Sequence, residues 1–507
     1  MQEASEKKVE ERTEKVKNWL KEPSNLAILL VLAIAVVLRL YYFFITSSQA
    51  LWWDEAAYGS IAKTLVNPAF SASPILDREF IIRPLFLPFL WSIFLRLNLS
   101  EAVTRFFLIL IPSILSVFFT YLIIKEATSR RTALISSFII SALWIHLFYS
   151  MRLLTEIPAL FFSLVSVYFF VKAYKQDFAF KPFLLSILFL SFSVMMRFPF
   201  GLVGFAYILF VIFTARFSIL KKKSFWLGGI LGLIPLFLFF VYNTIHTGFF
   251  FPALKDVSST SQAAAPYAFY TLGFIPHYFK TAFFILFLLG ILLCLTELVL
   301  GFGKIRKNKR LESHLFMLVL MLVTLAFFIF IIRAAEDRYL FVSLISFIYL
   351  ASISIDYLYG IVKKYNRIIA VVLLILVLGI GFYQQFVFGD AMIKSKKESY
   401  SQMKEAFLWI KDNSSPDDTV MSSFGELYTI YYAERNALSI PQNETEFETY
   451  IAEKKPRLLV VHAFNQHPQY VYQYPQQHQL LMTTEKAWFF DAEQKQPAVI
   501  IYRFWNL

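Results

Sequence analysis

The sequence predicts an all-α polytopic membrane protein with about eleven transmembrane helices, followed by a small C-terminal α/β soluble domain. Hydrophobic residues make up 58% of the 507 residues and charged residues only 16%, with 58 phenylalanines. Apolar runs of roughly 18–22 residues recur along the chain, which is the length needed to cross a bilayer. After about residue 390 the composition becomes charged and rich in Asn, Gln and Pro, as in a soluble domain.

Eleven apolar segments are long enough to be spans. They cover residues 26–45, 104–124, 131–149, 156–173, 183–197, 199–217, 225–243, 278–300, 314–333, 338–359 and 367–388. Three parts follow from this division: a charged N-terminal segment (1–25), a transmembrane domain (26–389) and a C-terminal domain (390–507). We expect residues 1–25 to form a cytoplasmic amphipathic helix, and the first span to remain as an anchor rather than a cleaved signal.

Basic residues fall in every second loop, on the same side as the basic N-terminus. The clusters are Lys125/Arg130/Arg131, Lys172/Lys175/Lys181, Arg216/Lys221/Lys222/Lys223, Lys304/Arg306/Lys307/Lys309/Arg310 and Lys363/Lys364/Arg367. Because positive charge marks the cytoplasmic side, this alternation predicts an integral protein of the plasma (inner) membrane with a cytoplasmic N-terminus. The 46–103 loop and the C-terminal domain are then exoplasmic.

Both exoplasmic segments show local order. Ser60–Val66 and Leu85–Leu97 have the pattern of short interfacial helices. In the C-terminal domain, the pattern predicts helices over Ser399–Lys411 and Glu444–Lys454, and strands over Thr419–Ser423, Arg457–Ala463 and Ala498–Phe504.

Several function classes are disfavoured. The net charge of +13 could indicate nucleic-acid binding, but the basic residues occupy the loops that orientation requires, so we expect no nucleic-acid partner. The single cysteine, Cys294, allows no intrachain disulfide or Cys-based metal site. The sequence contains no Gly-rich phosphate loop, so we expect no nucleotide site.

The acidic pair Asp54-Glu55 follows Trp52-Trp53 about ten residues after the first span. Carboxylates at a membrane surface are costly to bury, which indicates function. Neighbouring helical residues point about 100° apart, so the two carboxylates are expected to have different roles. The alternative is an ordinary solvated pair in a loop.

Arginines recur at the predicted exoplasmic ends of the spans. They are Arg83, Arg152, Arg197, Arg333 and Arg338. The exoplasmic side is normally depleted of positive charge, and the planar guanidinium suits phosphate, so as a set they predict an anion site. The alternative is pairing within the protein, such as Arg152 with Glu156 or Arg338 with Asp337.

A carboxylate base and a group of arginines are the parts that a transferase acting on a lipid phosphate needs. The carboxylate removes the proton of an acceptor hydroxyl. The arginines stabilise the charge that develops on the leaving lipid phosphate.

Five segments, in order, resemble the GT-C glycosyltransferases that use polyprenyl-phosphate sugars, in particular the prokaryotic protein O-mannosyltransferase and aminoarabinose lipid A transferase branch. They are Trp53-Asp54-Glu55-x-x-Tyr58, Arg83-Pro84-Leu85, Arg152 with Glu156 and Pro158, Arg197-Phe198-Pro199, and Arg338-Tyr339-Leu340. The resemblance covers roughly residues 26–390. It implies a GT-C fold, with Asp54 as catalytic base and Arg83 in contact with the donor phosphate.

One departure limits what the resemblance implies, and one missing motif disfavours an alternative within the fold. Ile82 stands where the lipid A branch has an acid that helps to bind a metal, so the sequence gives no support for a divalent ion and predicts no required cofactor. The C-terminal domain lacks the Trp-Trp-Asp-Tyr-Gly motif of oligosaccharyltransferases, which disfavours that activity.

The sequence therefore predicts an inverting glycosyltransferase that moves one sugar from a polyprenyl-phosphate donor to a hydroxyl of a lipid, protein or glycan acceptor at the exoplasmic face. Asp54 is the general base. Glu55 is a positioning carboxylate, or it shares the contact with the acceptor. Donor phosphate contacts are assigned to Arg83, Arg197 and Arg338, and supporting roles to Tyr58, Arg152, Glu156 and Tyr339. The alternatives are a flippase or transporter for polyprenyl-linked lipids and a non-catalytic assembly subunit.

Overall fold

The computed structural model describes residues 21–68, 74–214, 217–248, 266–333 and 335–505, with Glu14, Asn18 and Phe250. The predicted N-terminal helix within 1–25 lies almost wholly outside these residues. The chain forms two compact units, and each is described by itself. The first unit comprises Met1–Ile45, Ile109–Met151 and Thr155–Ile393, and the second comprises Thr46–Leu108, Arg152–Leu154 and Lys394–Leu507.

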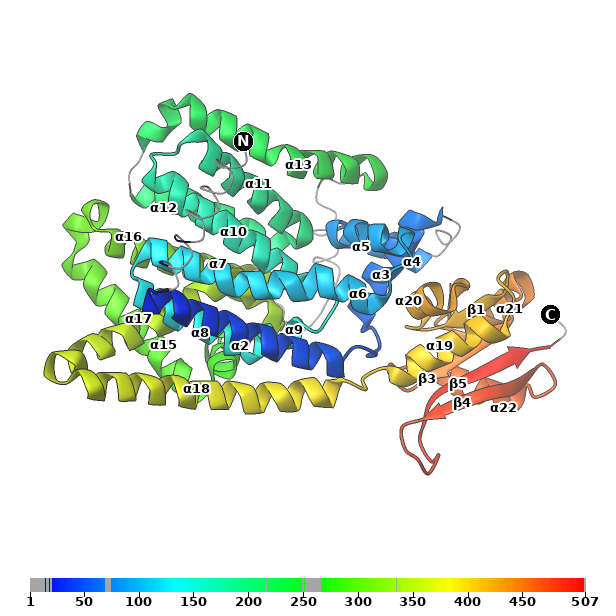
Figure 1. The fold of residues 1–507 in the computed structure, drawn as a ribbon. Helices are drawn as coiled ribbons and strands as arrows, with labels where there is room; N and C mark the ends of the chain where they lie inside the picture. The colour runs from blue at the N-terminus through cyan, green and yellow to red at the C-terminus, as the bar shows by residue number, and fades with distance from the viewer. Residues whose placement is uncertain are drawn as a thin grey trace, which may run out of the picture. The chain divides into compact units, whose positions relative to one another are not determined.

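The first unit is a helical bundle (Figure 1). Its helices are α2 (Pro23–Ile45), α7 (Ile111–Ala127), α8 (Arg130–Ala142), α9 (Trp144–Tyr149), α10 (Glu156–Lys175), α11 (Phe180–Met196), α12 (Gly201–Phe213), α13 (Lys223–Thr247), α15 (Ile275–Leu300), α16 (Lys309–Ala326), α17 (Leu344–Tyr365) and α18 (Arg367–Lys396). Short π-helical segments η2 (Phe106–Leu110), η5 (Phe269–Phe274) and η7 (Phe327–Ile332) and 3-10 segments η3 (Phe198–Phe200) and η8 (Asp337–Ser343) adjoin several of them.

Within the described residues, eight helical segments are long and apolar enough to cross a membrane, and three further apolar helices are shorter. The predicted fold class, a polytopic helical membrane protein, is confirmed. Within the described residues, all eleven predicted spans are mainly helical, but the segment 131–149 is divided at Leu143, whose ψ of 116° ends α8. The backbone N–H of Trp144, freed by this break, donates to Gln385 Oε1 at 3.0 Å.

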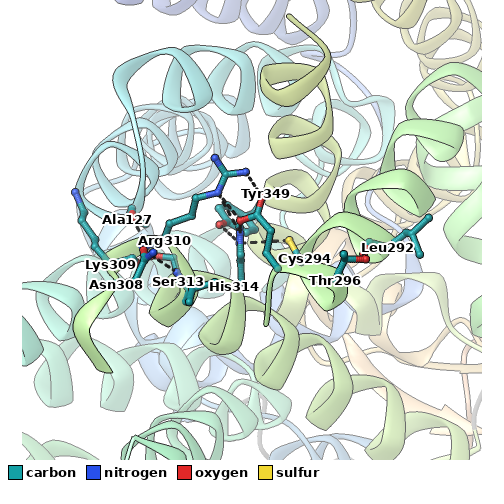
Figure 2. A network of polar contacts seen from close by, with 12 residues as sticks. Ala127, Leu292, Cys294, Thr296, Asn308, Lys309, Arg310, Ser313, His314 and Tyr349 are labelled. Carbon is teal, nitrogen blue, oxygen red and sulfur yellow. Dashed lines mark hydrogen bonds and ion pairs between the residues drawn. The ribbon is translucent and has the colours of Figure 1, made fainter. Parts of the chain in front are cut away.

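Among the eight long apolar segments, the one that contains α17 is the most enclosed, because every residue from Leu344 to Asp356 is buried. A polar network joins it to α15 and α16 (Figure 2). His314 lies 2.6 Å from Tyr349 Oη and 3.3 Å from Cys294 Sγ, and its Nε2 lies 2.9 Å from Glu297. Arg310 donates two hydrogen bonds to Glu297, at 2.6 and 2.7 Å. The lone cysteine is thus a buried contact in a structural network.

The second unit combines short helices with a mixed sheet. Its elements are α3 (Trp53–Val66), α4 (Pro74–Ile82), α5 (Phe86–Arg96), α6 (Glu101–Arg105), α19 (Ser401–Asn413), β1 (Thr419–Ser422), α20 (Glu426–Tyr428), η9 (Thr429–Ala433), β2 (Asn436–Ser439), α21 (Glu444–Lys454), β3 (Leu458–His462), α22 (Gln469–Gln477), β4 (Met482–Phe489) and β5 (Pro497–Phe504). The strand order is β2-β1-β3-β5-β4, with β2, β1 and β3 parallel and β5 antiparallel to both β3 and β4.

The sheet has a helix layer on each face. Phe447 of α21 and Val471 of α22 pack with Leu459 and Val461 in one apolar core. Alternate residues of a strand point to opposite faces, so the neighbouring buried side chains of β3 face the other way. On that side, Trp409 of α19 makes an edge contact with Trp488 of β4.

Candidate active site

Helix α3 begins at the predicted acidic motif. The Trp52 N–H donates to Glu55 Oε2 at 2.7 Å, which satisfies one of the backbone donors that a helix start leaves open. Asp54 and Glu55 occupy the first turn, where negative charge is stabilised by the helix dipole. The sequence therefore starts a helix here and places both carboxylates at its amino end.

Glu55 is enclosed on all sides. It is 1% exposed, accepts the Leu153 N–H at 2.5 Å and pairs with Arg152 at 3.4 Å. Burial raises the pKa of the Glu55 carboxyl, while Arg152 and the backbone donors oppose that shift. Burial lowers the pKa of Arg152, and Glu55 opposes it. With these groups in place, the carboxylate fixes α3 to residues 152–154.

Asp54 is the more open of the two acids. Its side chain is 25% exposed, and Oδ1 accepts a hydrogen bond from Arg83 Nη2 at 2.8 Å. Arg83 also forms an ion pair with Glu79 one turn earlier on α4, and its guanidinium lies 5.0 Å from the centre of the Tyr58 ring. Burial lowers the pKa of Arg83, but the nearby carboxylates, chiefly Asp54, outweigh this and raise it.

The structure thus brings Asp54, Tyr58 and Arg83 together, and adds a residue that the motif analysis missed. Glu79 is 4% exposed and shares Arg83 with Asp54. Its i,i+4 spacing from Arg83 was the available signal, because such pairs meet on one helix face.

Residues far along the chain hold α3 in place. Ser60 Oγ donates to the Leu427 carbonyl at 2.9 Å, and the ring of Trp53 stacks on Phe424 at 4.0 Å between centroids. A Cβ at Gly59 would lie 2.6 Å from the Tyr431 ring, so only glycine permits this close approach. The acid helix is therefore built onto the segment 424–431.

A second cluster lies in the first unit, around Glu156. This residue begins α10 and is fully buried. Its Oε1 lies 2.8 Å from Arg197 Nη1 and 3.5 Å from Arg338 Nη1. Arg338 also pairs at 3.0 Å with Glu336, whose side chain is 42% exposed. One buried carboxylate is thus shared by two arginines.

Tyr339 supports this second cluster. Its ring stacks on Phe328 at 4.6 Å, and the Arg197 guanidinium lies 5.5 Å from the ring centre. Cation–π contacts of this kind orient a guanidinium without neutralising its charge. Nearby, Asp337 accepts a hydrogen bond from Tyr149 Oη at 2.9 Å.

Of the two intraprotein pairings proposed from sequence spacing, the one between Arg152 and Glu156 is not formed. Arg152 pairs with Glu55 instead, because residues 152–155 are not helical and the i,i+4 geometry is absent. Arg338 pairs with Glu156 and Glu336, and it also interacts electrostatically with Asp337. The predicted site residues therefore divide into an acid cluster in the second unit (Asp54, Glu55, Tyr58, Glu79, Arg83, Arg152) and an arginine cluster in the first (Glu156, Arg197, Arg338, Tyr339).

The acid cluster does not fit a divalent metal. The Arg83 guanidinium occupies the space between the carboxylates of Asp54 and Glu79. Over the ranges that the structure describes, no group of three or more His, Cys, Asp and Glu side chains could hold an ion. No step of the chemistry below is therefore assigned to a metal.

Comparison with known proteins agrees with this architecture. Residues 82–242 match the model of the family described as dolichyl-phosphate-mannose-protein mannosyltransferase. The fold is similar to that of ArnT from Cupriavidus metallidurans in the apo state, with a TM-score of 0.67 at 12% identity, over 94% of this chain and 97% of that one.

The chain has an ArnT-like fold of the GT-C type, and its residues 82–242 resemble the mannosyltransferase family. Its predicted resemblance to these enzymes is confirmed. The Archaeoglobus fulgidus oligosaccharyltransferase is similar to this chain in fold, with a TM-score of 0.60 at 14% identity over 88% of this chain and 70% of that one. No curated protein matches it by sequence.

Proposed function

We propose that the chain transfers a single sugar from a polyprenyl-phosphate donor to an acceptor hydroxyl, with inversion at the anomeric carbon. The observation that carries this is the contrast on α3: Glu55 is enclosed by hydrogen bonds, whereas Asp54 is partly exposed and held by Arg83. The donor class is supported by a similar structure, ArnT from Cupriavidus metallidurans bound to undecaprenyl phosphate (TM-score 0.64, 11% identity, 94% of this chain and 97% of that one).

In the proposed reaction Asp54 accepts the proton of the acceptor hydroxyl. The acceptor oxygen attacks the anomeric carbon as the bond from that carbon to the phosphate oxygen breaks. The electron pair of this bond leaves with the polyprenyl phosphate, so a single displacement inverts the configuration. No nucleotide or other cofactor is required.

Arginines are assigned to the departing phosphate because charge grows on it in the transition state. Arg197 and Arg338 share one buried carboxylate, and the planar fork of donors on each guanidinium suits the oxygens of a phosphate. Arg83 uses Nε and Nη2 for Glu79 and Asp54, which leaves its Nη1 for the phosphate. Tyr58 and Tyr339 hold guanidinium groups in place.

The proposed orientation places residues 46–103 and 390–507 on the exoplasmic side and the N-terminus in the cytoplasm, following the loop charges. The acceptor is a lipid, a protein or a glycan.

The decisive experiment is transfer in proteoliposomes. Purified chain is incubated with a panel of polyprenyl-phosphate sugars and candidate acceptors, and products are identified by mass spectrometry. We expect one donor to yield glycosylated acceptor and free polyprenyl phosphate in equal amounts. Movement of intact donor across the bilayer without product would indicate a flippase, and no binding of any donor would indicate an assembly subunit.

A further inference from the structure

An open pocket of about 660 Å³ lies in the C-terminal part of the second unit, away from the residues assigned to chemistry. Its lining includes His462, Phe464, Asn465, Gln466, Tyr472 and Pro497. This volume is in the range of pockets that enclose small organic ligands.

The pocket lies where the sheet topology favours a ligand. From β1 the chain passes to β2 on one side and then to β3 on the other side of β1, and all three strands are parallel. The order therefore reverses between β1 and β3. In open α/β sheets, ligands bind outside the carboxyl ends of strands at such a reversal. β3 ends at His462, which lines the pocket.

The lining is neutral, polar and aromatic. Asn465 and Gln466 carry amides, which both donate and accept hydrogen bonds, and Phe464 and Tyr472 provide ring faces. Phe464 is held by ring contacts with Tyr400 at 5.0 Å and Phe490 at 5.3 Å. None of the pocket-lining residues is Lys, Arg, Asp or Glu. Such a surface suits an uncharged, hydroxyl-rich ligand rather than a phosphate or an ion.

Two buried histidines at the same strand end have unused hydrogen-bonding atoms. His462 Nε2 lies 2.7 Å from the Ser423 carbonyl, to which it must donate, so its Nδ1 is an acceptor. His467 Nε2 lies 3.0 Å from the His462 backbone nitrogen and 2.8 Å from the His462 carbonyl oxygen, so it is held by the backbone of the same residue. Neither Nδ1 has a hydrogen-bond partner. Burial lowers the pKa of His462 to about 4, so the ring is neutral at pH 7. The neutral ring of His462 adds no charge to the pocket lining.

One loop connects this pocket to the helix that carries Asp54. The loop after β1 accepts the His462 hydrogen bond at Ser423, and the next residue, Phe424, stacks on Trp53 at 4.0 Å. Asp54 follows Trp53 directly. Phe424 has a φ of 63°, a left-handed conformation that a bulky residue adopts only when its surroundings enforce it.

We propose that this pocket is the acceptor subsite, and that it binds an uncharged saccharide portion of the acceptor. The inference deepens the proposed function and rests on it. The pocket holds a sugar unit remote from the reacting hydroxyl, and the 423–425 loop aligns the bound acceptor with the helix that carries Asp54. The acceptor class is therefore a glycan or a glycolipid with a neutral sugar.

The test is direct binding to the purified full chain in nanodiscs. Saturation-transfer NMR with mannotriose and N-acetylchitotriose as probes is compared with a neutral Gly-Ser-Thr peptide and with inorganic phosphate. We expect binding of at least one oligosaccharide and of neither other probe. Binding of the peptide alone, of phosphate alone, or of no probe would overturn the proposal.

Variants locate the binding. Phe464→Ala removes a ring face and Gln466→Ala removes an exposed amide, so each should weaken oligosaccharide binding by about tenfold, the effect of losing roughly 1.4 kcal/mol. Gln466→Ala leaves the ring contacts of Phe464 intact. It therefore still tests the pocket if Phe464→Ala fails to fold. Trp505→Ala, beyond the opposite end of β5, is the matched control and should bind normally. Unchanged binding in both pocket variants would refute the assignment.

Turnover separates this inference from the function on which it rests. In proteoliposomes, Phe464→Ala and Gln466→Ala should raise the KM for the acceptor while leaving donor affinity unchanged. If transfer occurs and neither variant alters the acceptor KM, the subsite fails and the transferase stands. If the oligosaccharide binds at the pocket but no donor is ever used, the proposed transferase reaction fails and only the binding site remains.

Discussion

The acid cluster and the arginine cluster use the same residue types but differ in which type is shared. In the second unit, one arginine, Arg83, lies between the carboxylates of Asp54 and Glu79. In the first unit, one buried carboxylate, Glu156, lies between Arg197 and Arg338. A shared arginine leaves a carboxylate that can take a proton, whereas a shared carboxylate leaves guanidinium groups that can hold an anion. What distinguishes a base from an anion site is therefore the number of carboxylates per paired arginine, and not the presence of ion pairs.

The largest expected effect tests the acid side of this comparison. Asp54→Asn keeps the shape and the contact with Arg83 but removes the base, so transfer should fall by about 10³-fold or more. Donor affinity, measured by equilibrium binding, should change by less than about twofold. Asp77→Asn, an exposed change on α4, is the control and should retain activity. Near-normal turnover by Asp54→Asn would remove Asp54 as the base.

The arginine side predicts a smaller effect of a different kind. Arg197→Ala and Arg338→Ala each remove a charge-assisted contact worth about 2 kcal/mol, so the donor Kd should rise about 30-fold. Arg306→Ala, in an exposed basic turn, should leave the Kd unchanged. If both site variants bind donor as the unmodified chain does, the arginine cluster is structural.

Glu55 tests whether adjacent carboxylates have different roles. Glu55→Gln leaves Arg152 buried without its charge partner, and one-sided removal of this kind destabilises by about 3 kcal/mol. We expect Tm in detergent to fall by about 5 °C or more. Glu398→Gln, at a side chain 72% exposed, should not change Tm. A variant with normal Tm but no turnover would show instead that Glu55 takes part in the reaction.

The smallest expected effect is the contribution of Glu426 to the pH dependence of folding stability. Burial raises the pKa of Glu426 to about 7, above the value of about 4.5 in an unfolded chain. Between these two values the folded state holds more protons, so this residue lowers stability as pH rises from about 4.5 to 7. Glu426→Gln should therefore raise Tm relative to the unmodified chain more at pH 8 than at pH 5. An equal Tm difference at both pH values would show that Glu426 does not titrate in this way.

Much of this arrangement could be predicted from the sequence, because it follows from local pattern. Apolar length gave the spans, and α21 has the bounds that its periodicity predicts. Strands β2 and β4 were missed, since exposed polar residues interrupt their alternation. The break at Leu143 depends on Gln385, more than 200 residues away.

The candidate site also contains a part that could be predicted from the sequence and a part that could not. Asp54, Tyr58 and Arg83 belong to short motifs, and the structure brings them together. The partner of Glu55 was not predictable, because Arg152 is close to Glu156 in sequence but contacts Glu55 in the fold. Ion pairing between distant segments is set by tertiary packing, which sequence spacing does not record.

The burial of Cys294 has a practical consequence for labelling. The chain contains no other cysteine, and this thiol is enclosed beside His314. Aqueous maleimide reagents therefore have no accessible target in the natural protein. A cysteine introduced at Lys307 or at Glu493 would be the only reactive position, so an impermeant reagent applied to intact cells reports directly which loops face outward. The orientation inferred from loop charge can be mapped without first removing a native thiol.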